Sequence, residues 1–435
     1  MSKSSLGISW FFALAILFLS VILLLSQSAF GDERAGRPYI VVLKAGTSSA
    51  PAVAADHARR YGVQVSHIYE HALKGYAAVI PAARLEFVRN DPNVEFISDD
   101  RPVHTTARPG QFVPQSLPTG IDRIDGELSS HFASNTWGNI AVAVIDTGSG
   151  PHPDLNIVGG VNCSTGKSFG DGNGHGTHVA GTIGALNNTE GVIGVAPGVP
   201  IYSVRVLNNA GSGTFSSVAC GIDWVTANAA ALNIKVANMS LGGSGSDDGN
   251  CGNTAGDALH LAICNSVAAG VTYSVAAGND AADFANFVPA AYNEVLTVTA
   301  VADFNGQPGG GAAPTCRTDS DDTAADFSNF TIAASSDADH TIAAPGVCIL
   351  STWKGGGYNT ISGTSMATPH VTGTAALCIG TGNCTGGPSA VMTKLRSDAA
   401  SYGYGFIGDP NNPITSGGRL LQTLYYGYLV SAGGY

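Results

Sequence analysis

The sequence predicts an α/β protein in which a mostly parallel central sheet carries helices on both faces and follows a small α+β unit. Between residues 140 and 301, apolar runs typical of buried strands alternate with longer runs of helical spacing. Parallel strands need crossover helices, so this alternation predicts a sheet buried between two helical layers. Residues 37–100 precede it with shorter strand-like runs and no cysteine, which indicates a separate unit.

The composition is that of a globular protein without an affinity for nucleic acid. The 435 residues are 44% apolar and 12% charged, enough to bury a large core. The formal net charge is −12, from 20 basic and 32 acidic residues, and no basic run follows residue 31. Because nucleic-acid-binding proteins carry a basic patch, DNA and RNA are not expected as partners.

The first 31 residues have the pattern of an export signal. The apolar stretch ISWFFALAILFLSVILLL at residues 8–25 follows Lys3 and ends before SQSAFG. Ala29 and Gly31 suit the small-residue requirement of signal peptidase, so we expect residues 1–31 to be a signal peptide and the protein to be secreted. An uncleaved membrane anchor is the alternative, because about 20 apolar residues span a bilayer.

The α+β unit and a linker come next. Residues 37–100 contain strand-like runs at 39–46, 75–81 and 94–100, and a core of this size is marginal. Residues 101–114, RPVHTTARPGQFVP, hold three prolines and a glycine without periodicity, which is typical of an exposed linker. We place a domain boundary in this linker.

The main domain follows the linker. Strand-like runs lie at 140–148, 201–207, 234–240, 271–277 and 294–301, and helix-like runs at 177–186, 216–232 and 255–269. Ligands of such sheets bind beyond the carboxyl ends of the strands, so residues that end strands or begin helices are the site candidates. The glycine-rich, acidic stretch 303–325 indicates a surface insertion that Cys316 could tether.

The cysteines predict disulfides in the main domain alone. An even number in an exported chain favours disulfides, and no pair has the CxxC spacing of a zinc or redox site. The near pairs Cys251/Cys264 and Cys378/Cys384 could close short loops, but the pairing is not readable from the sequence. The eight cysteines are Cys163, Cys220, Cys251, Cys264, Cys316, Cys348, Cys378 and Cys384.

Three motifs place chemistry-bearing side chains at such positions. VAVIDTG ends an apolar strand with Asp146, whose burial is expensive unless it is hydrogen-bonded. Aspartic proteases also use DTG, but they need two such carboxylates, and the chain has no second DTG or DSG triplet. Asp146 alone could therefore be structural.

GDGNGHGTHVAG places His175 in a glycine-rich loop that runs into a helix, where it could serve as a base. His178 suggests a metal pair, but the run lacks the HExxH glutamate and a third ligand. The glycines do not have GxGxxG spacing, so a nucleotide site is not expected. In ISGTSMATPHV, Ser365 opens a helix behind a glycine and could be a nucleophile or an ordinary turn serine.

Together the motifs resemble the subtilisin-like serine proteases, in which aspartate, histidine and serine follow one another in this order. The resemblance covers residues 115 to about 400 and rests on VIDTG, GHGTHVAGT and SGTSMATPHV. It implies a three-layer subtilisin-like fold and an endopeptidase with Ser365 as nucleophile, His175 as base and Asp146 as the group that orients His175. Asn279 in SVAAGND matches the asparagine that stabilises the oxyanion.

The resemblance also implies a peptide-binding cleft of broad specificity. Two segments would clamp an extended peptide by backbone hydrogen bonds, and a third would form one wall of a pocket with room for a large apolar side chain. Phe287, near the opposite wall, departs from the family's usual glycine. The segments are Gly211, Ser212 and Gly213; Ser240, Leu241 and Gly242; and Ala276, Ala277 and Gly278.

A structural Ca²⁺ site is implied as well, in the loop LNNTEGVIGVAP. Side-chain oxygens and backbone carbonyls would give an oxygen-only set that suits Ca²⁺, whereas the alternative is a polar surface loop. The implied side-chain ligands are Gln115, Asp154 and Asn188, and the implied carbonyl ligands are Leu186, Glu190 and Val192.

Residues 32–106 resemble the family's inhibitory propeptide, which templates folding of the catalytic domain at 107–435 and is cut off by self-cleavage near residues 104–108. A permanently attached accessory domain is the alternative. The resulting expectation is a secreted, calcium-stabilised, monomeric serine endopeptidase that acts on proteins and peptides and has no organic cofactor. A catalytically silent relative that binds peptides and a membrane-anchored processing enzyme are the competing functions.

Overall fold

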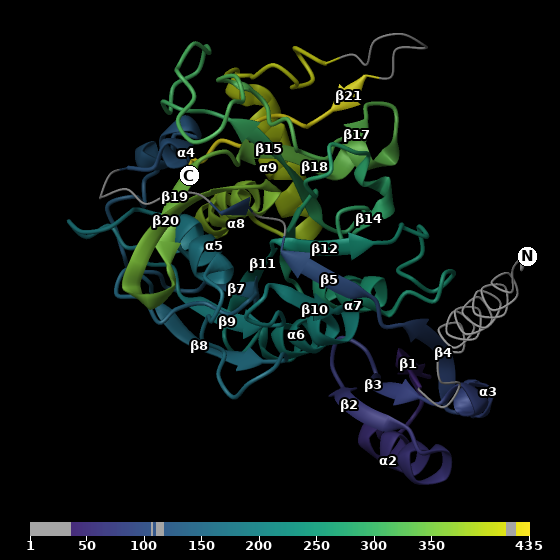
Figure 1. The fold of residues 1–435 in the computed structure, drawn as a ribbon. Coiled ribbons are helices and arrows are strands. Elements are labelled where there is room, and N and C mark those ends of the chain that lie inside the picture. Colours follow the sequence, from purple (N-terminus) through teal and green to yellow (C-terminus); the bar gives the residue numbers. More distant parts are fainter. Residues whose placement is uncertain (1–35, 106–107, 110–116, 415–422) are drawn as a thin grey trace, which may run out of the picture.

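The structure, a computed structural model, describes residues 36–105, 108–109, 117–414 and 423–435 (Figure 1). The centre is a mostly parallel sheet in the order β16-β15-β13-β11-β7-β9-β8, with β18 paired to β15. Only the short β16 runs antiparallel to its neighbour in this sheet. The strands are β7 (Ala141–Asp146), β8 (Ile157–Asn162), β9 (Ile201–Arg205), β11 (Ile234–Met239), β13 (Thr272–Ala276), β15 (Leu296–Ala302), β16 (Thr323–Ala324) and β18 (Thr341–Pro345).

Helices cover both faces of this sheet, as the apolar alternation predicts. Along β7, Val142 and Val144 pack into the core under α5, α8 and α9, whereas Ala143 and Ile145 pack into the core under α6 and α7. Every residue of β7 is buried, which explains why its sequence is a continuous apolar run that ends in Asp146. The helices are α5 (His175–Gly184), α6 (Phe215–Asn228), α7 (Ala258–Ala268), α8 (Thr364–Gly380) and α9 (Pro388–Tyr402).

The N-terminal unit has its own four-stranded antiparallel sheet, in the order β2-β3-β1-β4. One face of the sheet packs on its helices and forms a small separate core around Val41, Tyr76 and Ile80. The opposite face adds Ile40 and Val42 to the core of the main domain under α6 and α7. The elements are β1 (Arg37–Leu43), α2 (Ala50–Tyr61), β2 (Gln64–Tyr69), β3 (Gly75–Ile80), α3 (Leu85–Arg89) and β4 (Val94–Asp99).

The N-terminal unit packs against α6 (Figure 1), and two carboxylates hold it there. Asp223 of α6 accepts hydrogen bonds from the backbone N–H groups of His71 and Ala72 at 2.7 and 2.6 Å. In return, Asp100 accepts bonds from the N–H and the hydroxyl of Ser216 in the first turn of α6. Negative charge at a helix N-terminus is favourable, so this contact adds to the apolar interface.

The linker prediction for residues 101–114 is wrong for the part that the structure describes. β5 (Pro102–Thr105) lies between β10 (Ser212–Thr214) and β12 (Leu241–Ser244) and is antiparallel to both. Val103 within β5 is 1% exposed. β6 (Arg108–Pro109) then pairs with β20 (Gly357–Ser362). The prolines suggested an irregular loop, but strands supplied by the main domain give this segment backbone partners.

The insertion at 303–325 is exposed over most of its length, but its ends are buried around a cation. Arg123 is 1% exposed and pairs with Asp322 at 2.8 Å and with Asp303 at 3.5 Å. Burial raises the pKa of Asp303 to about 7. The acidic residues of this stretch suggested an exposed loop, but two of them, Asp303 and Asp322, are buried next to Arg123.

All eight cysteines form disulfides, and both near pairs are among them. Cys316 tethers the exposed part of the insertion to Cys348, as the sequence suggested. The bonds are Cys163–Cys220, Cys251–Cys264, Cys316–Cys348 and Cys378–Cys384.

Among the helices of the described segments, none combines the length and the apolar character that a membrane crossing requires. The apolar stretch at 8–25, Gln115 and the junction residues 106–107 lie outside the described residues. The remaining α-helix and strands of the described residues are α4 (Thr119–Arg123), β14 (Phe287–Val288), β17 (Thr331–Ile332), β19 (Ile349–Trp353) and β21 (Leu424–Tyr425).

Candidate active site

Asp146 and His175 meet at the carboxyl edge of the sheet. Asp146 is the last residue of β7 and His175 is the first residue of α5. His175 Nδ1 lies 2.8 Å from Asp146 Oδ1, which also accepts the backbone N–H of Thr147 at 2.6 Å. Both side chains are buried, at 3% and 0% exposure. The sequence alone allowed a purely structural role for Asp146. In the structure, its carboxylate is hydrogen-bonded to the imidazole of His175.

Asp171 organises the loop that delivers His175. Its Oδ1 accepts the hydroxyl of Thr147 and the N–H groups of Asn173 and Gly174, and its Oδ2 accepts the N–H and hydroxyl of Thr177. One carboxylate thus links the end of β7 to the start of α5. Sequence reasoning missed this residue, although an aspartate at the head of a glycine-rich loop is the signal for such a turn.

Ser365 lies in the first turn of α8, which packs against α5 (Figure 1). Its hydroxyl donates to the carbonyl of Ser240 at 3.1 Å, and its own carbonyl accepts the hydroxyl of Ser240 at 2.9 Å. Ser365 is 0% exposed in this form of the chain, in which β5 and β6 pair with the neighbouring strands β12 and β20. The helix start also directs backbone N–H groups toward this position.

Asn279 follows β13 by three residues and is oriented by Thr364. Its Oδ1 accepts the backbone N–H of Thr364 at 2.9 Å and the hydroxyl of Thr364 at 3.0 Å. An amide whose oxygen is held in this way presents its N–H donors on the other side. Thr364 is a second residue that sequence reasoning missed, and its position next to Ser365 was the available signal.

Two glycines allow the close approach of backbone segments at the site. Gly278 has φ +105° and donates its N–H to the hydroxyl of Thr364, and a Cβ there would collide with the amide of Asn329. A Cβ on Gly176 would collide with the carbonyl of Gly148. Larger residues at these positions would push apart the segments that carry Asn279 and His175.

The two predicted clamp segments flank one extended strand. Gly213 of β10 is paired with Val103 of β5, and Leu241 of β12 is paired with Thr105. These pairs use backbone groups, which is the arrangement that strand addition requires. In the predicted pocket wall, Ala276 ends β13 and Ala277 follows it, and both are fully buried.

Phe287 lies between the clamp segment 240–242 and the predicted pocket wall 276–278. A Cβ on Gly242 would collide with the Phe287 ring, and a Cβ on Gly278 would lie 3.2 Å from it. The ring is therefore part of any pocket between the segments 240–242 and 276–278. The room for a large apolar side chain is smaller than the alanines and glycine alone suggest.

The predicted calcium residues that the structure describes lie together. Asp154 accepts the side-chain N–H of Asn188 at 2.8 Å and the backbone N–H of Val192 at 3.1 Å. Leu186 donates its N–H to the carbonyl of Asp154, and Glu190 donates its N–H to Asn188 Oδ1. The carbonyl oxygens of Leu186, Glu190 and Val192 are thus on a loop that wraps around one buried carboxylate.

His178 does not form a metal pair with His175. Its Nε2 lies 2.9 Å from the carbonyl of Ile349, and burial lowers its pKa to about 3. His370 of α8 is buried in the same way, and its pKa falls to about 4. Both rings are therefore neutral core side chains.

Two family models match the sequence. The model of the subtilase family matches residues 138–405, and the model of the peptidase inhibitor I9 family matches residues 38–106. The first match contains Asp146, His175 and Ser365, and the second ends at the junction after β5.

Characterised proteins match over most of the chain. Subtilisin E of Bacillus subtilis (strain 168) is 35% identical over 413 residues, which are 93% of this chain and 96% of that protein. A thermostable alkaline protease of Halalkalibacterium halodurans is 37% identical over 370 residues, which are 84% and 88% of the two chains. The crystal structure of a cold adapted subtilisin-like serine proteinase matches with a TM-score of 0.54 and 34% identity, over 73% of this chain and 99% of that one.

Proposed function

The chain belongs to the subtilase family of serine endopeptidases, and from that membership we propose that it is a secreted zymogen that hydrolyses peptide bonds through Ser365, His175 and Asp146. The observation that carries the proposal is the 2.8 Å contact between His175 Nδ1 and Asp146 Oδ1, beside α8, whose first turn contains Ser365. This contact holds the imidazole in the tautomer whose Nε2 can accept a proton.

In the proposed reaction, Ser365 Oγ attacks the carbonyl carbon of the substrate and gives its proton to His175 Nε2. That nitrogen is buried and makes no hydrogen bond to any residue that the structure describes. His175 then returns the proton to the leaving amine, and water releases the acyl group by the same steps in reverse order. Asp146 stabilises the imidazolium that forms between the two transfers.

The negative oxygen of the tetrahedral intermediate needs donors, and we assign this role to the Asn279 side chain and the Ser365 backbone N–H. We expect Asn279→Leu to reduce kcat by about 10² to 10³, the magnitude known for the corresponding residue of subtilisin, which we take over for this relative. Steady-state kinetics on a peptide anilide would measure it. The KM should change little, and a loss confined to KM would contradict the assignment.

We propose that residues 32–106 inhibit the enzyme until they are cut away. The match to the I9 inhibitor family supports the chain's own propeptide as its inhibitor. β5 pairs with β12 directly after Ser240, and β6 pairs with β20, which ends three residues before Ser365. The bonds between Thr105 and Arg108 are thus the candidates for self-cleavage, in line with the expected range 104–108.

Recognition of substrates by backbone pairing with β10 and β12 would make the specificity broad, since such bonds are independent of side chains. Side-chain selection would come from the pocket next to Phe287. Proteins and peptides are the substrates, and the mature enzyme is proposed to act as an extracellular monomer.

We also propose a structural Ca²⁺ ion bound at the loop around Asp154. Burial raises the pKa of the Asp154 carboxyl, and the negative charge of nearby Glu190 raises it further. No cation is among the neighbouring groups that act most strongly on this carboxyl. A Cβ on Gly191 would collide with the carboxylate and with Tyr358, so the loop is tightly fitted. An oxygen-rich loop around an uncompensated carboxylate suits Ca²⁺, which would supply the missing positive charge.

Removal of calcium is expected to lower the stability of the mature protein. At a Ca²⁺ concentration of 100 times Kd, binding contributes about 2.7 kcal/mol, and its loss should lower Tm by roughly 5 °C or more. Calorimetry with and without a chelator measures the shift. Asp154→Asn should abolish the calcium effect, whereas Asp326→Asn, at an exposed carboxylate, should keep it. An equal shift in both variants would contradict the site.

A catalytically silent, peptide-binding relative is the competing function. A serine-reactive phosphonate separates the two, because only an activated serine is modified. Modification of the tryptic peptide that contains Ser365 is the expected result, and an unmodified mature protein would favour the silent relative.

A further inference from the structure

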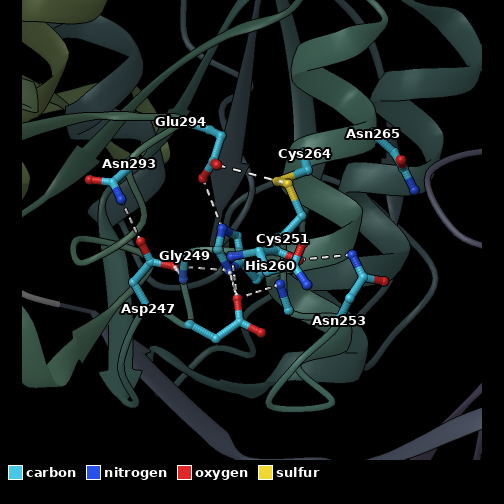
Figure 2. Close-up of a disulfide and its surroundings, with 12 residues drawn as sticks. Asp247, Gly249, Cys251, Asn253, His260, Cys264, Asn265, Asn293 and Glu294 are labelled. Carbon is cyan, nitrogen blue, oxygen red and sulfur yellow. Dashed lines mark hydrogen bonds and ion pairs between the residues drawn. A yellow bond between two sulfur atoms is a disulfide. The ribbon is translucent and has the colours of Figure 1, made fainter.

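A polar cluster outside the proposed active site has the arrangement of a metal site. Asp247 and Asp248 lie in the loop between β12 and α7, His260 lies in the first turn of α7, and Glu294 precedes β15. The Cys251–Cys264 disulfide fastens this loop to α7. Figure 2 shows His260 between Glu294 on one side and Asp247 on the other.

His260 is buried and rigidly held. Its side chain is 1% exposed, and its ring stacks on Tyr292 with the centroids 4.0 Å apart and the planes within 4°. Nε2 lies 2.8 Å from Glu294 Oε2, so the hydrogen on this nitrogen points at a carboxylate. Nδ1 faces the opposite way, toward Asp247 and Asp248, and makes no hydrogen bond within the described residues.

The distances on the Nδ1 side favour a shared ion over hydrogen bonds. Nδ1 lies 3.4 Å from Asp247 Oδ1 and 3.5 Å from Asp248 Oδ1. Charged N–H···O contacts are typically about 2.7 to 2.9 Å long. Two ligand atoms that each bind one tetrahedral ion at about 2.1 Å are about 3.4 Å apart. Both distances from Nδ1 therefore match ligands that converge on one ion, and the three ligand atoms lie within 4.8 Å of one another.

The charges of the cluster are also those that a cation requires. The carboxylate of Asp248 is fixed by four backbone N–H groups, which are those of Asn250, Gly252, Thr254 and Ala255. Within the described part of the chain, His260 is the one ion-pair partner of the cluster's carboxylates. The cluster is thus negatively charged around a buried nitrogen.

We propose that Asp247 Oδ1, Asp248 Oδ1 and His260 Nδ1 bind one divalent transition-metal ion, with Zn²⁺ as the best match. Imidazole together with carboxylates suits Zn²⁺ better than the oxygen-only set of a calcium site. A carboxylate behind the second ring nitrogen is typical of zinc-binding histidines, and Glu294 occupies that place. This site is independent of the proposed calcium loop and of the proposed catalytic residues.

The site is connected by side-chain contacts to Arg101, the residue before β5. Tyr292, on which His260 stacks, donates its hydroxyl to Asp257 Oδ2 at 2.7 Å. The same oxygen pairs with Arg101, at the entry of β5, at 3.1 Å. Binding at His260 is thus connected through three contacts to the segment that passes between β10 and β12.

The test is Co²⁺ and Zn²⁺ titration of the purified, phosphonate-treated protein in excess Ca²⁺, which keeps oxygen-only sites filled. His260→Gln keeps a donor for Glu294 but lacks the Nδ1 ligand, and Asp247→Asn removes one carboxylate. We expect the wild type to bind one more equivalent than either variant, with a Co²⁺ d–d absorption band. Glu294→Gln should bind about 10- to 100-fold more weakly.

Each result decides the proposal. The wild type and all variants bind the same amount of metal at any other site, for example at His175. The difference in stoichiometry between them therefore reports the proposed site alone. Equal stoichiometry in the wild type, His260→Gln and Asp247→Asn would overturn the site, and His260 would then be an imidazolium held by carboxylates. If His260→Gln does not fold, as judged by circular dichroism, Asp247→Asn alone carries the comparison.

Discussion

Ser365→Ala is expected to yield an inactive precursor that keeps its N-terminal unit. Without Oγ no acyl intermediate can form, and kcat should fall by about 10⁶, the magnitude reported for loss of the nucleophile in subtilisin, which we carry over to this relative. Because we propose that the same serine cuts the junction, residues 32–106 should remain attached after signal removal. Mass spectrometry of the secreted protein and casein hydrolysis measure the two effects.

Two controls separate chemistry from folding in that experiment. Ser401→Ala, at an exposed serine of α9, should be processed and active like the wild type. Added wild-type enzyme should cut the Ser365→Ala precursor between Thr105 and Arg108, which would demonstrate that the junction is intact. A purified Ser365→Ala protein that cuts itself would refute the assigned nucleophile.

Asp146→Asn is expected to lower kcat by about 10⁴ with little change in KM. An asparagine amide can turn an N–H toward Nδ1 of His175, which shifts the ring hydrogen to Nε2. That tautomer cannot accept the proton of Ser365. The side chain keeps its size at a position that is 0% exposed, so the fold should survive.

Kinetics on active-site-titrated enzyme measure this loss, and Asp398→Asn on α9 is the matched control for removal of a carboxylate. The control should stay within a factor of about two, because surface ion pairs such as that of Asp398 with Lys394 contribute little. A change of the same size in both variants would show that the loss is not specific to Asp146 and would contradict the tautomer argument.

The elements that are set by local pattern were predictable from the sequence. The apolar run of β7 predicted a buried strand that ends in Asp146, and the structure confirms it. The sequence placed His175 in a glycine-rich loop just before a helix-like run at 177–186, and in the structure the helix begins two residues earlier, at His175 itself. Such positions follow from strand burial and helix entry, which are encoded within a few residues.

Features that depend on distant partners were not predictable. The stretch 101–114, which contains β5, looks like a linker because its prolines and glycine are local signals. Gly213, a partner of β5, lies more than one hundred residues further along the chain. Arg123 and the aspartates around it are separated by about 200 residues, so nothing local marks Asp303 or Asp322 as buried. The hydrogen bond between Thr364 and Asn279 was not predictable for the same reason, because the two residues are 85 positions apart in the sequence.

The uneven placement of the disulfides has a consequence for the lifetime of the two parts of the chain. All four lie between Cys163 and Cys384, and the unit at 36–101 has none. Once severed, that unit keeps only its small core, so it will open often and be digested. The cross-linked part unfolds less readily, so it should resist digestion by other molecules of the active enzyme. The precursor thus joins a small unit that is degraded quickly to a larger one that persists.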